Sequence, residues 1–145
     1  MMNRGVVRAI CISERKGTPK SPIPEARFIE NHGIENDAHA GPGNRQVSLL
    51  AATTIADFNR RGAEVREGAF GENLIIEGID LTKLPIGTKF KCSDVELQLT
   101  EIGKECHTRC QIYNKMGDCI MPTNGVFAQV LKGGKVQVGD MITYS

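Results

Sequence analysis

The sequence predicts a mainly β protein in which short strands form a barrel or a strongly curled mixed sheet, with one or two short helices. The 16 glycines and 6 prolines are spread along the chain rather than gathered in one linker, so turn signals recur throughout. Between these signals, short runs alternate apolar and polar residues, which is typical of strands buried on one face. The regular alternation of strands with long helices that predicts a βαβ fold is not seen.

The clearest local pattern is a hairpin. Within the expected strand 95–101, apolar side chains at 95, 97 and 99 alternate with polar ones at 96, 98 and 100, and residues 88–92 alternate likewise. Ser93 and Asp94, which separate the two runs, form a candidate two-residue turn. We therefore expect a hairpin that leads directly into the cysteine-containing segment 103–113.

A second hairpin is expected near the end of the chain. The apolar runs 125–131 and 135–138 flank Gly133 and Gly134. A pair of glycines can supply the positive φ angles of a tight hairpin turn. The sequence therefore predicts that these two runs pair with each other.

The remaining elements are one helix, one strand and one loop. Ser48 is a candidate N-cap for a helix that runs through Arg61, with apolar residues on one face and Gly62 as a stop signal. The apolar run 74–76 is expected to form a strand. Residues 15–25 hold three of the six prolines and several charges, so we expect an irregular surface loop without chemistry.

Length and composition favour one globular domain spanning residues 1–145, with 40% hydrophobic and 24% charged residues. The formal net charge of +1 gives no general attraction to phosphate backbones, so nucleic acid is not an expected partner. No apolar stretch is long enough to span a bilayer, and no membrane partner is expected. Five cysteines, an odd number, without a secretory signal favour the reducing cytoplasm. Exposed edges of a partial barrel make a homodimer plausible.

The densest chemical motif is Cys106, His107, Arg109 and Cys110. Neighbouring cations lower the pKa of a thiol, and the resulting thiolate can accept sulfur as a persulfide or bind a soft metal. In this interpretation Cys110 carries the sulfur and Cys106 assists it. The alternative is that both cysteines are small buried residues at the end of a strand.

A zinc site is a second alternative for this segment. Three sulfurs and one nitrogen are available from Cys106, His107, Cys110 and Cys119. The Cys-x3-Cys spacing lies at the edge of the usual range, and no second ligand pair follows it. Cys11 and Cys92 fall in predicted strands and are expected in the core.

A polar, glycine-rich segment lies between residues 31 and 48. Asp37 and His39 are close enough in sequence to orient each other, and Arg45 can bind a phosphate or carboxylate with its fork of donors. Its other polar and glycine positions are Asn44, Gly33, Gly41 and Gly43, and the glycines allow close backbone approach to a ligand. The segment could therefore hold an anionic ligand. Alternatively, it is a polar turn that caps the following helix.

A third, weaker patch consists of Gly71, Glu72 and Asn73, directly before the strand at 74–76. Taken alone, these residues could simply satisfy the backbone hydrogen bonds of a turn.

Together these motifs resemble the MOSC domain, named for the C-terminal domain of molybdenum cofactor sulfurases. The resemblance rests on the order of GIENDAHAGPGNRQVSLL, FGENLIIEGIDL, IGTKF, TEIGKECHTRCQIY and VQVGDMI, and covers roughly residues 4–143. It implies a β-rich barrel and an association with the molybdenum cofactor. It also implies a key cysteine, matched by Cys110, that carries persulfide sulfur or ligates molybdenum. The motifs recurring in the family match Asp37, His39 and Gly41, then Gly71, Glu72 and Asn73, which become candidate cofactor-binding residues.

The resemblance also bears on partners and activity. We expect no counterpart of the extra N-terminal domain that, in larger reductase members, helps to enclose the cofactor, and no lysine stands in a recognisable pyridoxal-phosphate setting. Pyridoxal phosphate is therefore expected on a partner, such as a cysteine desulfurase, and other expected partners are molybdenum cofactor biosynthesis proteins. Three functions stay open. They are a cofactor-binding or sulfur-carrying module, a small molybdenum-dependent reductase of N-hydroxylated compounds, and a structural or zinc-stapled interaction domain with inert cysteines.

Overall fold

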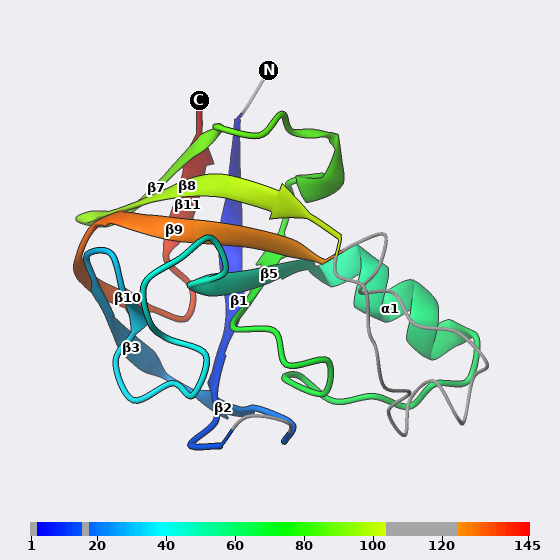
Figure 1. Ribbon diagram of the computed structural model, residues 1–145. Helices are drawn as coiled ribbons and strands as arrows, with labels where there is room; N and C mark the ends of the chain where they lie inside the picture. Colours follow the sequence, from blue (N-terminus) through cyan, green and yellow to red (C-terminus); the bar gives the residue numbers. More distant parts are fainter. Residues whose placement is uncertain (1–2, 16–17, 104–124) are drawn as a thin grey trace.

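The computed structural model describes residues 3–15, 18–103 and 125–145. Seven strands form a closed mixed barrel in the order β11-β7-β8-β9-β5-β6-β1, because β11 pairs back onto β1, and β2 extends β1 at its far end. Figure 1 shows this barrel with both chain ends at the same side. The strands of this sheet are β1 (Arg4–Ile12), β2 (Ser21–Ile23), β5 (Val47–Ala51), β6 (Leu74–Glu77), β7 (Lys89–Cys92), β8 (Val95–Ile102), β9 (Val126–Lys132) and β11 (Met141–Tyr144). The predicted mainly β, barrel-like fold is confirmed.

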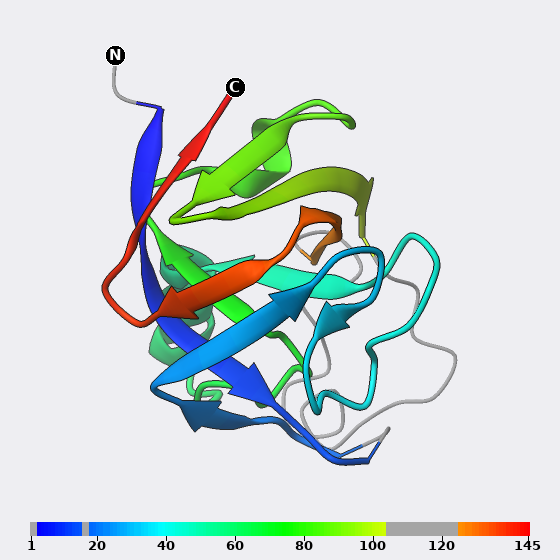
Figure 2. The same cartoon turned by 90° about the vertical axis from the view of Figure 1, so that its left-hand side faces the viewer.

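A smaller sheet packs beside the barrel. It contains β10 (Gly134–Gln137), β3 (Glu25–Ile29) and β4 (Gly33–Ile34), in the order β10-β3-β4. Figure 2 shows β3 and β10 lying side by side in this sheet. Because β4 leads directly into the segment after residue 34, this sheet carries the polar glycine-rich segment of the sequence.

The barrel is mixed because β5 and β6 are parallel, whereas the other pairings in this sheet are antiparallel. Helix α1 (Ala52–Arg60) connects the two parallel strands and lies outside the barrel wall (Figure 1). The unit β5-α1-β6 is therefore one local βαβ crossover in an otherwise antiparallel fold.

Two apolar clusters result from the alternation of side chains along the strands. The larger fills the barrel and includes residues from the predicted strands, such as Leu97, Leu99 and Phe90. The smaller lies between α1 and the wall. It consists of Ala9, Cys11, Leu50, Ile55, Phe58, Ala63, Ile75 and Phe127.

The first predicted hairpin is confirmed. Strands β7 and β8 pair antiparallel with Cys92 opposite Val95, so Ser93 and Asp94 form the turn. Ser93 has a φ of 54°, the left-handed conformation that such a turn requires. The predicted strand at 74–76 is also confirmed as the core of β6.

The second predicted hairpin is wrong. Strand β9 pairs with β8 and β5 in the barrel, whereas β10 pairs with β3 in the smaller sheet. Gly133 lies at the passage between the sheets, where a Cβ would be 2.5 Å from the carbonyl oxygen of Phe28. The glycine is therefore required by close backbone packing and not by a hairpin turn.

The predicted start of the helix and the predicted surface loop both need correction. Ser48 lies inside strand β5, and the helix begins after Ala51, which makes no side-chain capping bond. The segment 15–25 is not wholly irregular, because it contains β2 and the buried residue Lys20. Among the residues described, no helix is long and apolar enough to cross a membrane.

Candidate functional site

A buried ion pair lies at the centre of the candidate site. Lys20 Nζ is 2.6 Å from Asp37 Oδ1, and both side chains are 0% exposed. Lys20 directly precedes β2, and Asp37 lies three residues after the end of β4. The two short strands therefore bring together charges that are 17 residues apart in the sequence.

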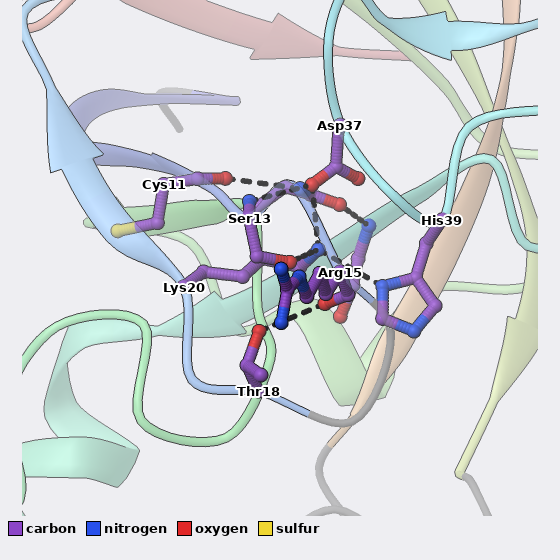
Figure 3. A network of polar contacts seen from close by, with 9 residues as sticks. Cys11, Ser13, Arg15, Thr18, Lys20, Asp37 and His39 are labelled. Atoms are coloured by element: carbon purple, nitrogen blue, oxygen red, sulfur yellow. Dashed lines mark hydrogen bonds and ion pairs between the residues drawn. The ribbon is translucent and has the colours of Figure 1, made fainter.

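The ion pair belongs to a larger polar network (Figure 3). Lys20 Nζ also lies 2.9 Å from His39 Nδ1 and 3.3 Å from Ser13 Oγ. The backbone N–H of Ser13 donates to Asp37 Oδ1 at 3.1 Å. Asp37 and His39, which the sequence predicted to orient each other, are thus joined through one ammonium group. We name Ser13, Lys20, Asp37 and His39 the lysine cluster.

One acceptor of the lysine cluster has no partner in the part of the chain that the structure describes. Asp37 Oδ2 is buried and accepts no hydrogen bond from any described residue. A buried carboxylate oxygen without a donor is costly, and such groups are rare in folded proteins. An N–H or O–H donor of a bound ligand would satisfy this oxygen.

A second turn supports the backbone of Lys20. The Lys20 N–H donates to the Gly68 carbonyl at 2.9 Å, and a Cβ on Gly68 would lie 2.1 Å from the Lys20 carbonyl oxygen. Glu72 in turn accepts from the N–H groups of Gly68 at 2.9 Å and Phe70 at 3.0 Å. Burial raises the pKa of Glu72, and the bonds from Gly68 and Phe70 oppose that rise.

Asn73 has a structural role. Its Oδ1 accepts from the Ser48 N–H at 2.9 Å, and its side-chain amide donates to the Cys11 carbonyl at 3.0 Å. Asn73 therefore links β1 and β5 at the start of β6. Both Glu72 and Asn73 satisfy backbone groups, as one interpretation of the sequence predicted. Gly71 has a φ of 79° and open space where a Cβ would lie.

The other polar candidates of the segment contact the barrel wall. Arg45 Nε is 2.6 Å and Nη2 is 2.5 Å from Glu101 Oε2, and the guanidinium stacks 5.1 Å from the ring centre of Phe127. The carbonyl of Asn44 accepts a hydrogen bond from the Thr100 hydroxyl. An anion that binds Arg45 would have to compete with the Glu101 carboxylate.

The glycines of the segment differ in their surroundings. Gly33 packs against its own chain, because a Cβ there would be 2.7 Å from the Gln46 carbonyl oxygen. Gly41 and Gly43 both have positive φ angles and open space at the Cβ position. Only the latter two are placed so that backbone could approach a ligand closely. Strand β5 separates the segment from α1, so the predicted helix-capping alternative is wrong.

Cys11 and Cys92 are buried in the core, as predicted. Burial, and secondarily the charge of Glu72, raises the pKa of Cys11 to about 12. Burial and the charge of Asp140 raise the pKa of Cys92 to about 11. Neither thiol is therefore suited to act as a thiolate near neutral pH.

The cysteine motif lies outside the described residues, as do all its candidate ligands and catalytic groups, Cys106, His107, Arg109, Cys110 and Cys119. Their predicted roles stay predictions. Within the described part of the chain, no group of three or more His, Cys, Asp or Glu side chains could hold a metal.

Sequence reasoning missed two members of the lysine cluster. Lys20 lies within, and Ser13 shortly before, the segment 15–25, whose three prolines and several charges favoured a solvated loop. The short strand that follows Lys20, Ser21–Ile23, contains a proline and only one β-branched residue, so no local pattern indicated that Lys20 is buried. Its burial depends on Asp37, which the sequence cannot place beside it.

The protein is a closed, mainly β barrel, and its buried polar cluster includes Asp37 and His39 of the glycine-containing segment 31–48. Residues 35–143 match the MOSC domain. The chain belongs to the MOSC domain family, which is associated with functions related to the molybdenum cofactor. No curated protein sequence matches the chain closely enough to be reported as a relative.

Solved structures share the fold. The crystal structure of the YuaD protein from Bacillus subtilis superposes with a TM-score of 0.81 at 17% identity, covering 97% of this chain and 95% of that one. YiiM from Geobacillus stearothermophilus gives a TM-score of 0.74 at 16% identity over 97% and 75% of the two chains. YiiM from Escherichia coli gives 0.70 at 18% identity over 98% and 69%. At these identities the similarity shows the fold alone.

The residues of the lysine cluster fit a polar, ring-shaped cofactor in their donor and acceptor types. Asp37 Oδ2 is an acceptor without a partner among the residues that the structure describes, which suits an N–H of a pterin ring. Gly41 and Gly43 leave space beside the backbone. The Lys20 charge is already matched by Asp37, so its ammonium group is not free to pair with an anionic group of a ligand.

Proposed function

We propose that this protein binds the molybdenum cofactor beside the lysine cluster, with the Cys110 thiolate as the group that ligates molybdenum or carries sulfur for cofactor maturation. The observation that carries the proposal is the buried Asp37 Oδ2 of the Asp37–His39–Gly41 motif, which has no hydrogen-bond partner within residues 3–15, 18–103 and 125–145. Membership in the MOSC domain family supports the choice of cofactor.

The buried Lys20–Asp37 ion pair is the first support for this role. A buried salt bridge adds little net stability, because desolvation of both charges offsets their attraction. Its persistence in a 145-residue protein, together with an unsatisfied carboxylate oxygen, favours a role in recognition. Perturbed and unsatisfied polar groups concentrate at functional sites.

Each residue has a defined task in this proposal. Asp37 accepts a hydrogen bond through Oδ2, while its Oδ1 stays bound to Lys20 and Ser13. Gly41 and Gly43 allow the ligand to approach the backbone. When bound, the cofactor supplies the redox and sulfur chemistry of molybdenum. Asn44 and Arg45, with Gly71, Glu72 and Asn73, maintain the surrounding segments through their contacts.

Cys110 is proposed as the reactive thiol because His107 and Arg109 flank it in the sequence. Cys11 and Cys92 are poor candidates for this role, since burial raises the pKa of both thiols. A soft thiolate suits both molybdenum ligation and persulfide formation. Persulfide loading would require a sulfur donor, for which a separate pyridoxal-phosphate-dependent cysteine desulfurase is the proposed partner.

The test is reconstitution followed by gel filtration. The purified protein is incubated with molybdenum cofactor, and the protein peak is analysed for molybdenum and for pterin fluorescence. We expect the wild type to retain both, Asp37→Asn to retain less of both, and the exposed control Asp57→Asn to behave as wild type, because Asp57 lies on the outer helix α1.

Cys110→Ser separates the two roles of the thiol. If Cys110 ligates molybdenum, this variant loses metal, whereas Cys119→Ser keeps it. If Cys110 carries sulfur, the wild type gains the mass of one sulfur atom on its peptide after incubation with a cysteine desulfurase and cysteine. A wild-type protein that retains neither metal nor pterin and gains no sulfur would contradict the proposal.

A further inference from the structure

The ammonium group of Lys20 has one acceptor for each of its donors. An ammonium carries three N–H donors and no acceptor. Among the described residues, its acceptors are Asp37 Oδ1 at 2.6 Å, His39 Nδ1 at 2.9 Å and Ser13 Oγ at 3.3 Å. The side chains of Lys20 and Asp37 are both 0% exposed, so water does not replace any of these partners at the ion pair.

This arrangement determines the role of one ring nitrogen. Because the ammonium can only donate, His39 Nδ1 must accept, and a neutral imidazole that accepts at Nδ1 carries its proton at Nε2. A proton on Nδ1 would place two donors 2.9 Å apart. The partner of one ring nitrogen thus decides the state of the other, as is general for functional histidines.

The position of Lys20 is itself constrained from the backbone side. Its N–H donates to the carbonyl of Gly68, and Gly68 packs too closely against the Lys20 carbonyl to carry a side chain. The Glu72 carboxylate binds the Gly68 N–H in turn. The turn at 68–72 is therefore connected to His39 through Lys20. Lys20 belongs to neither of the two recurring motifs, Asp37–His39–Gly41 and Gly71–Glu72–Asn73.

We propose that Lys20 is a positioning residue that fixes His39 as the Nε2–H tautomer, so that the site presents a hydrogen-bond donor at His39. Any group paired with His39 Nε2, from the protein or from a ligand, must then be an acceptor. If the group that pairs with His39 Nε2–H belongs to a ligand, it must be an oxygen or sulfur acceptor and not an N–H donor. This consequence for a ligand rests on the proposed function. Within one cluster, Asp37 Oδ2 is then an acceptor and His39 Nε2–H a donor.

The test uses nuclear magnetic resonance of the cofactor-free protein with ¹⁵N-labelled histidine. The chain has 3 histidines, and the His39→Gln variant assigns the resonances of His39. At about pH 8.5, where an unperturbed imidazole is neutral, long-range ¹H–¹⁵N correlations distinguish the two tautomers. We expect one tautomer at His39, protonated at Nε2, with an Nδ1 shift typical of a hydrogen-bond acceptor.

Lys20→Met removes the donor while keeping most of the side-chain volume. In this variant we expect the Nδ1 shift to move to that of an unbonded ring nitrogen and both tautomers to become populated. Lys135→Met, which removes an exposed ammonium paired with Glu25, should leave His39 unchanged. Lost tautomer selection at one ring nitrogen is a result that general destabilisation of a folded protein would not produce.

Two results would overturn the inference. One is a wild-type His39 protonated at Nδ1, and the other is a folded Lys20→Met protein whose His39 shifts match the wild type. If Lys20→Met does not fold, the wild-type spectrum alone decides. The measurement needs no cofactor, so the tautomer can be confirmed even where cofactor binding fails, and cofactor binding can succeed where the tautomer proves wrong.

Discussion

Removing one charge of the Lys20–Asp37 pair leaves the other buried without a partner. We expect Lys20→Met and Asp37→Leu each to lower the free energy of unfolding by about 3 kcal/mol, the usual cost of breaking a buried pair. The double variant removes both charges, so it should lose less than the sum of the single variants. Urea denaturation of the four proteins measures the coupling.

Additive losses would contradict the interpretation that the two side chains form one electrostatic unit. Lys135→Met provides the control, because Lys135 and Glu25 form an exposed ion pair that should matter little for stability.

Glu72 should make stability depend on pH. Burial is the largest cause that raises the pKa of Glu72 above its ordinary value of 4.5, so the folded state holds the proton to higher pH than the unfolded state does. A group with this shift favours folding below the ordinary pKa, and its contribution declines as pH rises through the folded-state value. Glu72→Gln cannot ionise and should lack this decline.

The measurement is the free energy of unfolding of the wild type and Glu72→Gln at a series of pH values. We expect the wild type to lose stability relative to the variant as pH rises above 4.5. A difference that stays constant with pH would show that Glu72 titrates alike in both states.

The buried cysteines and Cys110 should differ in how readily their thiols are alkylated. Because burial raises the pKa of Cys11 to about 12 and of Cys92 to about 11, neither should react with iodoacetamide in the folded protein. Both should react in urea. If His107 and Arg109 lower the pKa of Cys110, its peptide should still be labelled below the pH at which an ordinary thiol slows. Peptide mass spectrometry compares all sites in one sample, and rapid native labelling of Cys11 would contradict the packing under α1.

Among the elements, the start of α1 shows that a local sequence signal can be overridden by tertiary structure. Ser48 resembles an N-cap in the sequence, but it lies in β5, and no described residue forms a hydrogen bond with its buried hydroxyl. We therefore expect Ser48→Ala to leave stability unchanged or slightly higher, rather than to cost the roughly 1 kcal/mol of a lost cap.

Ala51→Ser is the matched variant, because Ala51 occupies the true N-cap position with extended backbone angles and no capping side chain. A serine there should add about 1 kcal/mol to the free energy of unfolding. Thermal or urea unfolding of both variants checks the assignment. Destabilisation by Ser48→Ala together with no gain from Ala51→Ser would favour the earlier helix start.

The sequence correctly predicted the elements that depend on interactions between residues close together in the chain. The hairpin of β7 and β8 follows from strict alternation around a two-residue turn, and the structure confirms it. The second hairpin failed because Gly133 is needed for packing against Phe28, a contact across about a hundred residues that no local pattern contains. The buried state of Lys20 was missed for the same reason, since its partner Asp37 lies in another element.

At the scale of the whole molecule, many short strands with recurring turn signals were enough to predict a curled β fold. Closure of the barrel joins β1 to β11, the first and last strands described, and this pairing depends on the whole chain. The candidate site was predicted in part. Asp37 and His39 do lie together, whereas Arg45 contacts Glu101 and Phe127 on the barrel wall.

The binding site is tested directly by titrating the ¹⁵N-histidine-labelled protein with molybdenum cofactor and following the His39 ring, while bound molybdenum is measured on the same samples. We predict that the resonances of His39 shift in proportion to bound cofactor, and that Asp37→Asn weakens the effect. Cofactor that binds while His39 stays unchanged would place the site elsewhere on the protein, and a protein that binds no cofactor at any concentration would contradict the proposed function itself.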